Sequence, residues 1–163
     1  MNEAGRPTAA PLLARFHTEA DGLEDFWGRR DGLPLRESFH LFGRPFEMRA
    51  GHTCFVDALT QTLPAYSRAA AATVPPILIE ATVATSAPDR GPLPKDLAAA
   101  FVGRGTWATI DVGGFGHAWI DLERLEGRIV VHPRLAQRPD LVRLWLLDTV
   151  LLNLLIASGF GML

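Results

Sequence analysis

The sequence contains a single cysteine, Cys54, which excludes an internal disulfide framework of the kind found in small secreted proteins. Its first residues, MNEAGRPTAAPLLARF, also lack the basic segment followed by an apolar segment that is typical of a secretory signal peptide. Both absences favour a reducing compartment, and we predict a cytoplasmic location.

Strong charge of one sign and long hydrophobic runs are missing as well. The 16 basic and 18 acidic residues give a formal net charge of -2. The chain therefore has no excess of positive charge with which to bind nucleic acid or an anionic membrane surface. The most apolar stretch, Leu144 to Ala157, is shorter than a membrane-spanning helix and contains Asp148 and Asn153. We therefore expect neither a nucleic-acid nor a membrane partner, and we interpret this stretch as a core helix.

What is present is enough hydrophobic sequence for one folded domain. The chain has 163 residues, of which 48% are hydrophobic and 21% are charged, as is usual for a single globular domain. Residues 1–11 lack hydrophobic periodicity and are predicted to form a loose arm. Residues 12–163 are predicted to form a single α+β domain.

Several short segments bounded by glycine and proline alternate apolar and polar residues as strands do. The last three follow one another with hairpin-length separations, which predicts an antiparallel meander and hence a small, mostly antiparallel sheet. Helical spacing predicts one short and one long helix. The predicted strands lie within residues 38–49, in ILIEATVAT (77–85), and in GTWATIDV, HAWIDLE and GRIVVHP; the predicted helices cover residues 51–63 and about 139–158.

The C-terminal helix is predicted to be long and hydrophobic. Pro139 and Asp140 suit its first turn, and Gly159 suits the position just after its end. Apolar residues nearly encircle its axis, and the chain then ends at Leu163 on the apolar stretch NLLIASGFGML. We therefore expect that further polypeptide covers this helix and that the domain is incomplete at its C-terminus.

The stretch GRIVVHPRLAQRPDLVRLWLLDTVLLNLLIASGFGML, residues 127–163, resembles the segment that precedes the phosphate-binding loop of HPr kinase-like proteins. These bacterial proteins belong with the phosphoenolpyruvate carboxykinase-type P-loop proteins. The resemblance implies that the full-length protein is a kinase that transfers a phosphoryl group from ATP to a protein or peptide. This chain would be its non-catalytic N-terminal part, with a downstream kinase-like domain or the protein or peptide substrate as partner.

The chain itself contains no G-x-x-x-x-G-K-[ST] motif. In such a loop the backbone N–H groups and a lysine hold the phosphates, while a hydroxyl and a carboxylate hold magnesium. The single lysine, Lys95, lies in a proline-rich segment without a preceding loop of this kind. On this interpretation we expect no catalytic, cofactor-binding or metal-binding residues here, and ATP and magnesium only with a downstream P-loop.

An alternative starts from FGHAWIDLE, which resembles the histidine strand of transglutaminase-like cysteine enzymes, a family of peptidases and acyl-transferases. The resemblance implies that Cys54, near the start of a helix, is the nucleophile and that His117 is the general base and acid. That family places an Asp-Pro pair about fifteen residues later, where this chain has His132 followed by proline, and a histidine at this position cannot supply the negative charge that orients the imidazole. Asp121 is too far along the strand from His117 for a direct hydrogen bond.

A third interpretation is a non-enzymatic binding module of a peptide-modification system, for which the sequence defines no site. Metal binding is not predicted, because the histidines show neither H-x-x-x-H spacing nor a cluster with cysteine. They are His17, His40, His52, His117 and His132.

Overall fold

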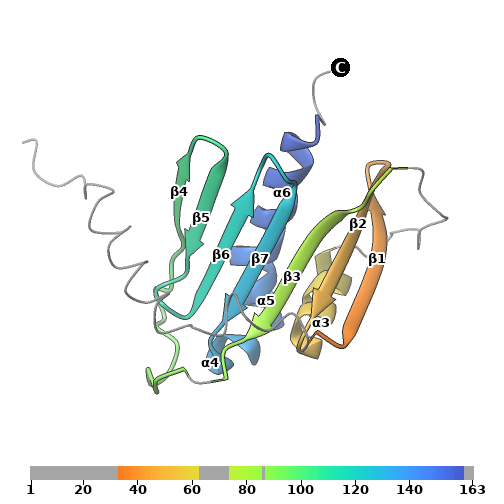
Figure 1. Cartoon of the computed structure of the whole chain (residues 1–163). Helices are drawn as coiled ribbons and strands as arrows, with labels where there is room; N and C mark the ends of the chain where they lie inside the picture. Colours follow the sequence, from red (N-terminus) through yellow and green to blue (C-terminus); the bar gives the residue numbers. More distant parts are fainter. Residues whose placement is uncertain (1–32, 63–73, 86, 160–163) are drawn as a thin grey trace, which may run out of the picture. The chain divides into compact units, whose positions relative to one another are not determined.

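A computed structural model describes residues 33–62, 74–85 and 87–159, which belong to one compact unit spanning Leu33–Leu163. The boundary predicted after residue 11 lies outside the described residues. Within the described residues, seven strands form one sheet in the order β1-β2-β3-β7-β6-β5-β4 (Figure 1). The strands are β1 (Leu35–Leu41), β2 (Arg44–Ala50), β3 (Ile77–Val83), β4 (Ala100–Arg104), β5 (Trp107–Asp111), β6 (Gly116–Asp121) and β7 (Glu126–Val131).

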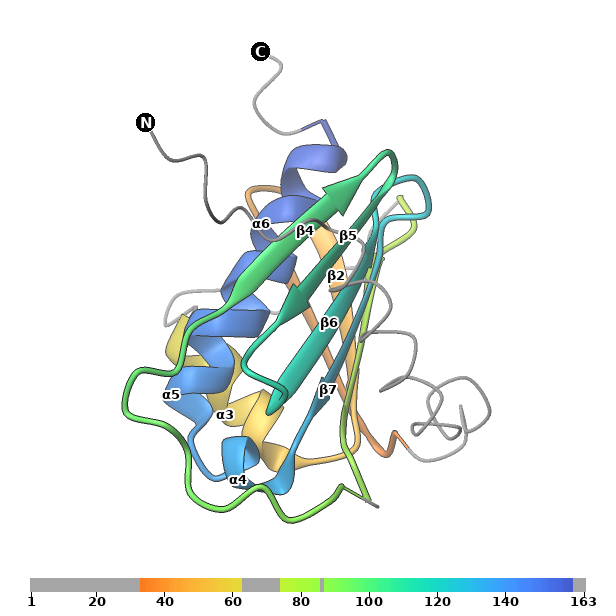
Figure 2. The ribbon, with the colours of Figure 1, turned by 90° about the vertical axis from the view of Figure 1, so that its left-hand side faces the viewer.

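The described helices all lie on one face of this sheet (Figure 2). The short helix α3 (Thr53–Thr62) connects β2 to β3. After β7 come α4 (Pro133–Ala136), α5 (Pro139–Val142), the π-helical turn η2 (Arg143–Leu147) and α6 (Asp148–Ala157). The architecture is therefore two layers, a sheet with helices on one side, which confirms the predicted α+β class.

The expectation of a small, mostly antiparallel sheet is wrong, because the sheet is mixed. β3 lies between β2 and β7 and runs parallel to both. The pairs β1–β2, β7–β6, β6–β5 and β5–β4 are antiparallel. The hairpins follow from local turn residues, whereas a parallel pairing joins strands that are distant in sequence and leaves no short-range signal.

The alanine-rich segment from Asp96 to Phe101 has a weak propensity for helix, yet its end belongs to the edge strand β4. β4 pairs with β5 through a tight turn, and Arg104 lies opposite Trp107. Pairing with the neighbouring strand therefore overrides the weak local preference for helix.

Alternation along the strands separates a helix-facing side from an opposite side. The helix-facing residues include Met48, Ile79, Ile110, Ile120 and Ile129, which are all fully buried. α6 approaches this side so closely that a Cβ placed on Gly127 of β7 would lie 2.6 Å from Val150 Cγ1. Glycine in β7 therefore permits the contact between the helix and the sheet.

The predicted C-terminal helix is confirmed between Pro139 and Ala157, with one feature that the periodicity did not predict. In η2 the Asp148 N–H donates to the Arg143 carbonyl, so the helix contains one wide turn. Gly159 follows the helix with φ +90, as expected of a residue just beyond a helix end. Among the described residues, no helix is long and apolar enough to cross a membrane.

Candidate functional site

The carboxyl ends of the parallel strands β2, β3 and β7 meet at one edge of the sheet, the lower edge in Figure 1. Cys54 follows β2 closely, and His132 comes directly after β7. His117 is near the start of β6, which runs antiparallel to β7 and so begins at the same edge. The fold therefore brings all three residues of the cysteine-enzyme alternative to one end of the sheet, although not to one site.

Cys54 lies in the first turn of α3 and is only 2% exposed. Its backbone N–H donates to Nδ1 of His52 at 3.1 Å, so the imidazole of His52 caps the helix. Burial of the thiol, with a smaller effect of the Asp57 carboxylate, raises the pKa of Cys54 to about 11. A helix N-terminus by itself favours the thiolate, but burial dominates here and keeps the thiol protonated.

His117 points to the sheet face opposite the helices, because its neighbours Gly116 and Ala118 are buried on the helix side. Cys54 belongs to the hydrophobic core on that helix side. The sheet therefore lies between the thiol and the imidazole. A direct proton transfer between them, which a cysteine nucleophile requires, is not available in this arrangement.

The carboxylate partner of His117 is Asp111, which the sequence interpretation missed. Asp111 lies directly opposite His117 on the neighbouring strand β5, with 3.3 Å between Asp111 Oδ1 and His117 Nδ1. Asp121 instead accepts hydrogen bonds from the backbone N–H groups of Glu123 and Arg124 in the next turn. Pairing the strands on either side of the GGFG turn would have identified Asp111 from the sequence.

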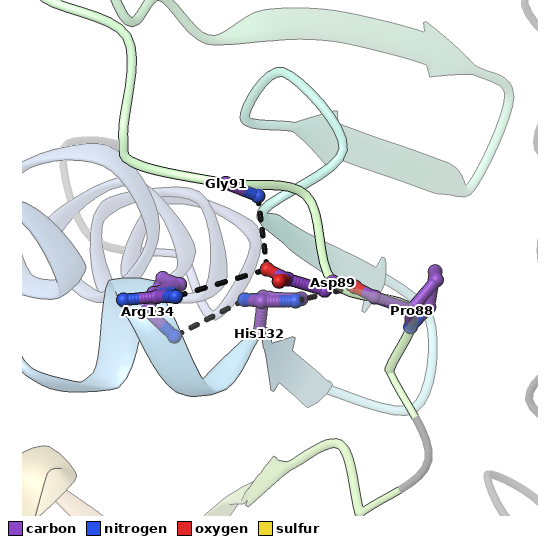
Figure 3. A network of polar contacts seen from close by, with 5 residues as sticks. All are labelled: Pro88, Asp89, Gly91, His132 and Arg134. Atoms are coloured by element: carbon purple, nitrogen blue, oxygen red, sulfur yellow. Dashed lines mark hydrogen bonds and ion pairs between the residues drawn. The ribbon is translucent and has the colours of Figure 1, made fainter.

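His132 is 8% exposed and joins two segments of the chain (Figure 3). Its Nδ1 accepts a hydrogen bond from the Arg134 backbone N–H at 3.1 Å, so this imidazole caps α4. Its Nε2 lies 2.9 Å from the carbonyl oxygen of Pro88. The ring of Phe115 contacts it edge to face, with 5.5 Å between ring centroids. His132 is thus occupied by structural contacts on both nitrogens.

The proline-rich segment 87–99 is fastened to this edge by further contacts. Asp89 Oδ1 accepts the Gly91 backbone N–H at 3.0 Å and lies 3.7 Å from a guanidinium nitrogen of Arg134 (Figure 3). Leu97 packs beside Gly113 in the turn between β5 and β6. The polar contacts at this edge of the sheet therefore anchor the loop 87–99.

No group of three or more histidine, cysteine, aspartate or glutamate side chains suited to a metal ion occurs among residues 33–62, 74–85 and 87–159. His40 lies in β1, and His52 caps α3. His17 lies outside the described residues. The prediction of no metal site thus stays a prediction.

A second candidate surface lies on the C-terminal helix. Leu144, Leu152 and Ile156 are 51%, 56% and 57% exposed, whereas Leu151 and Leu155 of the same helix are buried. Residues 152 and 156 are one turn apart, and the wide turn η2 reduces the angular offset between residue 144 and this pair. We refer to Leu144, Leu152 and Ile156 as the outer stripe.

Comparison of the chain with protein-family models, with curated proteins and with solved structures finds no match.

Proposed function

We propose that this unit is a non-catalytic N-terminal part of an HPr kinase-like protein, and that the outer stripe docks onto the P-loop domain that performs phosphoryl transfer. The proposal rests mainly on the outer stripe, three large aliphatic side chains that are each more than half exposed on one helix. Exposed aliphatic clusters of this kind are typical of surfaces that another folded unit covers.

The energetics of the outer stripe suit an interface. Covering a half-exposed leucine or isoleucine contributes about 1 kcal/mol, so Leu144, Leu152 and Ile156 together contribute about 3 kcal/mol. The opposite side of α6 is buried against the sheet, since Val150 and Leu154 pack beside Gly127. The helix is therefore held in place on one side and presents the other side as a rigid face.

The residue types in the chain support a role in which this unit does not itself catalyse phosphoryl transfer. Phosphoryl transfer needs a phosphate cradle, a lysine and a magnesium ligand, and the 163 residues contain no G-x-x-x-x-G-K-[ST] motif. Another part of the full-length protein would hold ATP and magnesium. The cysteine-enzyme alternative with Cys54, His117 and His132 gains no support, because the thiol is buried and protonated and the sheet separates it from His117.

The test is a titration of the purified chain with the P-loop domain of an HPr kinase-like protein from the same genome, followed by calorimetry. We expect binding that Leu152→Ser weakens about fivefold, since losing the coverage of this half-exposed leucine removes about 1 kcal/mol. Trp107→Ser is the matched control. Its indole is 47% exposed on the opposite sheet face, so this substitution should leave the affinity unchanged.

Absence of binding to the P-loop domain, or equal affinity of the Leu152→Ser and wild-type chains, would contradict the proposal. Binding of a precursor peptide in place of the P-loop domain, with the same loss in Leu152→Ser, would identify a binding module of a peptide-modification system. Circular dichroism of each variant verifies that the fold is retained.

A further inference from the structure

One imidazole joins α4 to the segment 87–99 at the carboxyl edge of the sheet. His132 accepts from the Arg134 N–H through Nδ1 and contacts the Pro88 carbonyl oxygen through Nε2 (Figure 3). We propose that His132 is a pH-sensitive latch, which holds segment 87–99 against the edge when neutral and releases it when protonated. This proposal is independent of the docking function of the outer stripe.

The two contacts require one tautomer of the neutral ring. A backbone N–H can only donate, so Nδ1 must carry a lone pair to accept the bond from Arg134. A carbonyl oxygen can only accept, so Nε2 must carry the proton to donate to Pro88. Neutral His132 with the proton on Nε2 satisfies both partners.

Protonation makes this arrangement unfavourable. The imidazolium carries N–H groups on both nitrogens, and the Nδ1–H then faces the Arg134 N–H across 3.1 Å with no acceptor between them. The ring can relieve this contact only by rotating, which also moves Nε2 away from the Pro88 carbonyl. Because the same orientation serves both contacts, loss of the α4 cap and release of the segment are coupled.

Charged groups of both signs surround His132. α4 contributes the guanidinium of Arg134, and the segment contributes the carboxylate of Asp89, which lies 3.7 Å from that guanidinium. Arg90 of the segment reaches the turn between β5 and β6, where its guanidinium would contact a Cβ on Gly114. From this turn the uncharged ring of Phe115 packs on the imidazole.

Release is expected to be local. Leu93 and Leu97 pack against the hydrophobic core, so the far end of the segment keeps an anchor that does not titrate. The part nearest His132 includes Asp89, which is largely exposed and depends on the latch and on Arg134 for its position. Acidification should therefore loosen the start of segment 87–99 while the sheet and the helices stay folded.

The test is NMR spectroscopy of the ¹⁵N-labelled chain between about pH 8 and about pH 5, a range that includes ordinary imidazole titration. At the higher pH, the imidazole nitrogen shifts should report the tautomer protonated on Nε2. Across the titration of His132, the amide signals of Gly91 and Arg134 should shift together with the ring. Exchange of the Arg134 amide, corrected for the intrinsic rate at each pH, should become about fivefold faster, which corresponds to about 1 kcal/mol for a lost N-cap.

Two variants separate the latch from other titrating groups. Asn keeps an acceptor for the Arg134 N–H but cannot be protonated, so His132→Asn should abolish the pH response of Gly91. His52→Asn is the matched control, because His52 caps α3 through the same Nδ1 geometry and should leave that response intact.

An imidazole of His132 that remains neutral at about pH 5, or one that protonates without any change at Gly91 and Arg134, would overturn the proposal. Both results come from the wild-type chain and so do not depend on the folding of a variant. A pH response that persists in His132→Asn would also overturn it.

Discussion

The tight contact between β7 and α6 allows a stability prediction from a single methyl group. A Cβ on Gly127 would lie 2.6 Å from Val150 Cγ1 and 3.2 Å from Leu154 Cδ1. The first distance is far shorter than an ordinary carbon–carbon contact of about 3.5 to 4.0 Å. We therefore expect Gly127→Ala to push α6 away from the sheet or to force Val150 out of its preferred rotamer.

Two opposing effects determine the free energy of unfolding of Gly127→Ala. Overpacking of a closely packed core costs about 1 to 3 kcal/mol. Replacing a strand glycine by alanine returns about 0.5 to 1 kcal/mol, because the unfolded chain loses conformational freedom. The net expectation is a destabilisation of about 1 to 2 kcal/mol, or a decrease in Tm of roughly 3 to 8 °C for a unit of this size.

Urea and thermal unfolding of Gly127→Ala beside Gly103→Ala test this reasoning. A Cβ on Gly103 in the edge strand β4 would meet only Phe101 Cε1, at an ordinary 3.6 Å, so that variant should be neutral or slightly stabilised. Val150→Ala removes the clashing methyl groups, and the double variant Gly127→Ala/Val150→Ala should lose less stability than the sum of the two single variants. Equal stability of Gly127→Ala and Gly103→Ala, or strict additivity in the double variant, would refute the close packing of α6 on β7.

Further predictions concern Cys54 and the two sides of α6. With a pKa of about 11 instead of the ordinary 9.0, the Cys54 thiol is ~0.1% ionised at pH 8 instead of ~10%, so disulfide-reagent labelling of the native chain should be at least ~100-fold slower than in urea. Since the unfolded chain loses this thiol proton at lower pH than the native chain, stability should fall as pH rises from 9.0 towards 11, and Cys54→Ala should lessen that fall in urea titrations. On the helix, Leu151→Ser should lower the free energy of unfolding by at least about 2 kcal/mol because Leu151 is buried, whereas Leu152→Ser should change it by less than about 0.5 kcal/mol; equal losses would contradict the assigned orientation of α6.

Part of the candidate site could be predicted from local sequence and part could not. The chain order identifies His132 as the residue after a strand and before Pro133, a position suited to a helix cap. Its second partner, Pro88, is 44 residues away, and no local pattern links the two. The Asp111–His117 pair could be predicted in part. The turn between β5 and β6 is visible in the sequence, but the pairing also depends on the register of the hairpin.

The pKa of Cys54 could not be predicted from local sequence, for a different reason. Its place at the start of α3 is correct, and such a position lowers a thiol pKa when the thiol meets solvent. Burial in the core has the opposite effect and dominates here. α3 packs against α5 and η2, elements that begin at Pro139 and Arg143, far from Cys54 in the chain.

The sequence by itself determined the elements whose signals are short-range: the hairpins of β1–β2 and β5–β6, and the helix that begins at Pro139 and ends before Gly159. Turn residues, helix caps and the alternation of apolar side chains act within a few residues, so they can be read without the fold. Only the tertiary structure decided that β3 enters between β2 and β7, that the sheet separates Cys54 from His117, and that Leu152 stays exposed beside a buried Leu151. These outcomes follow from contacts between distant segments, whose energies depend on the packing of the whole core.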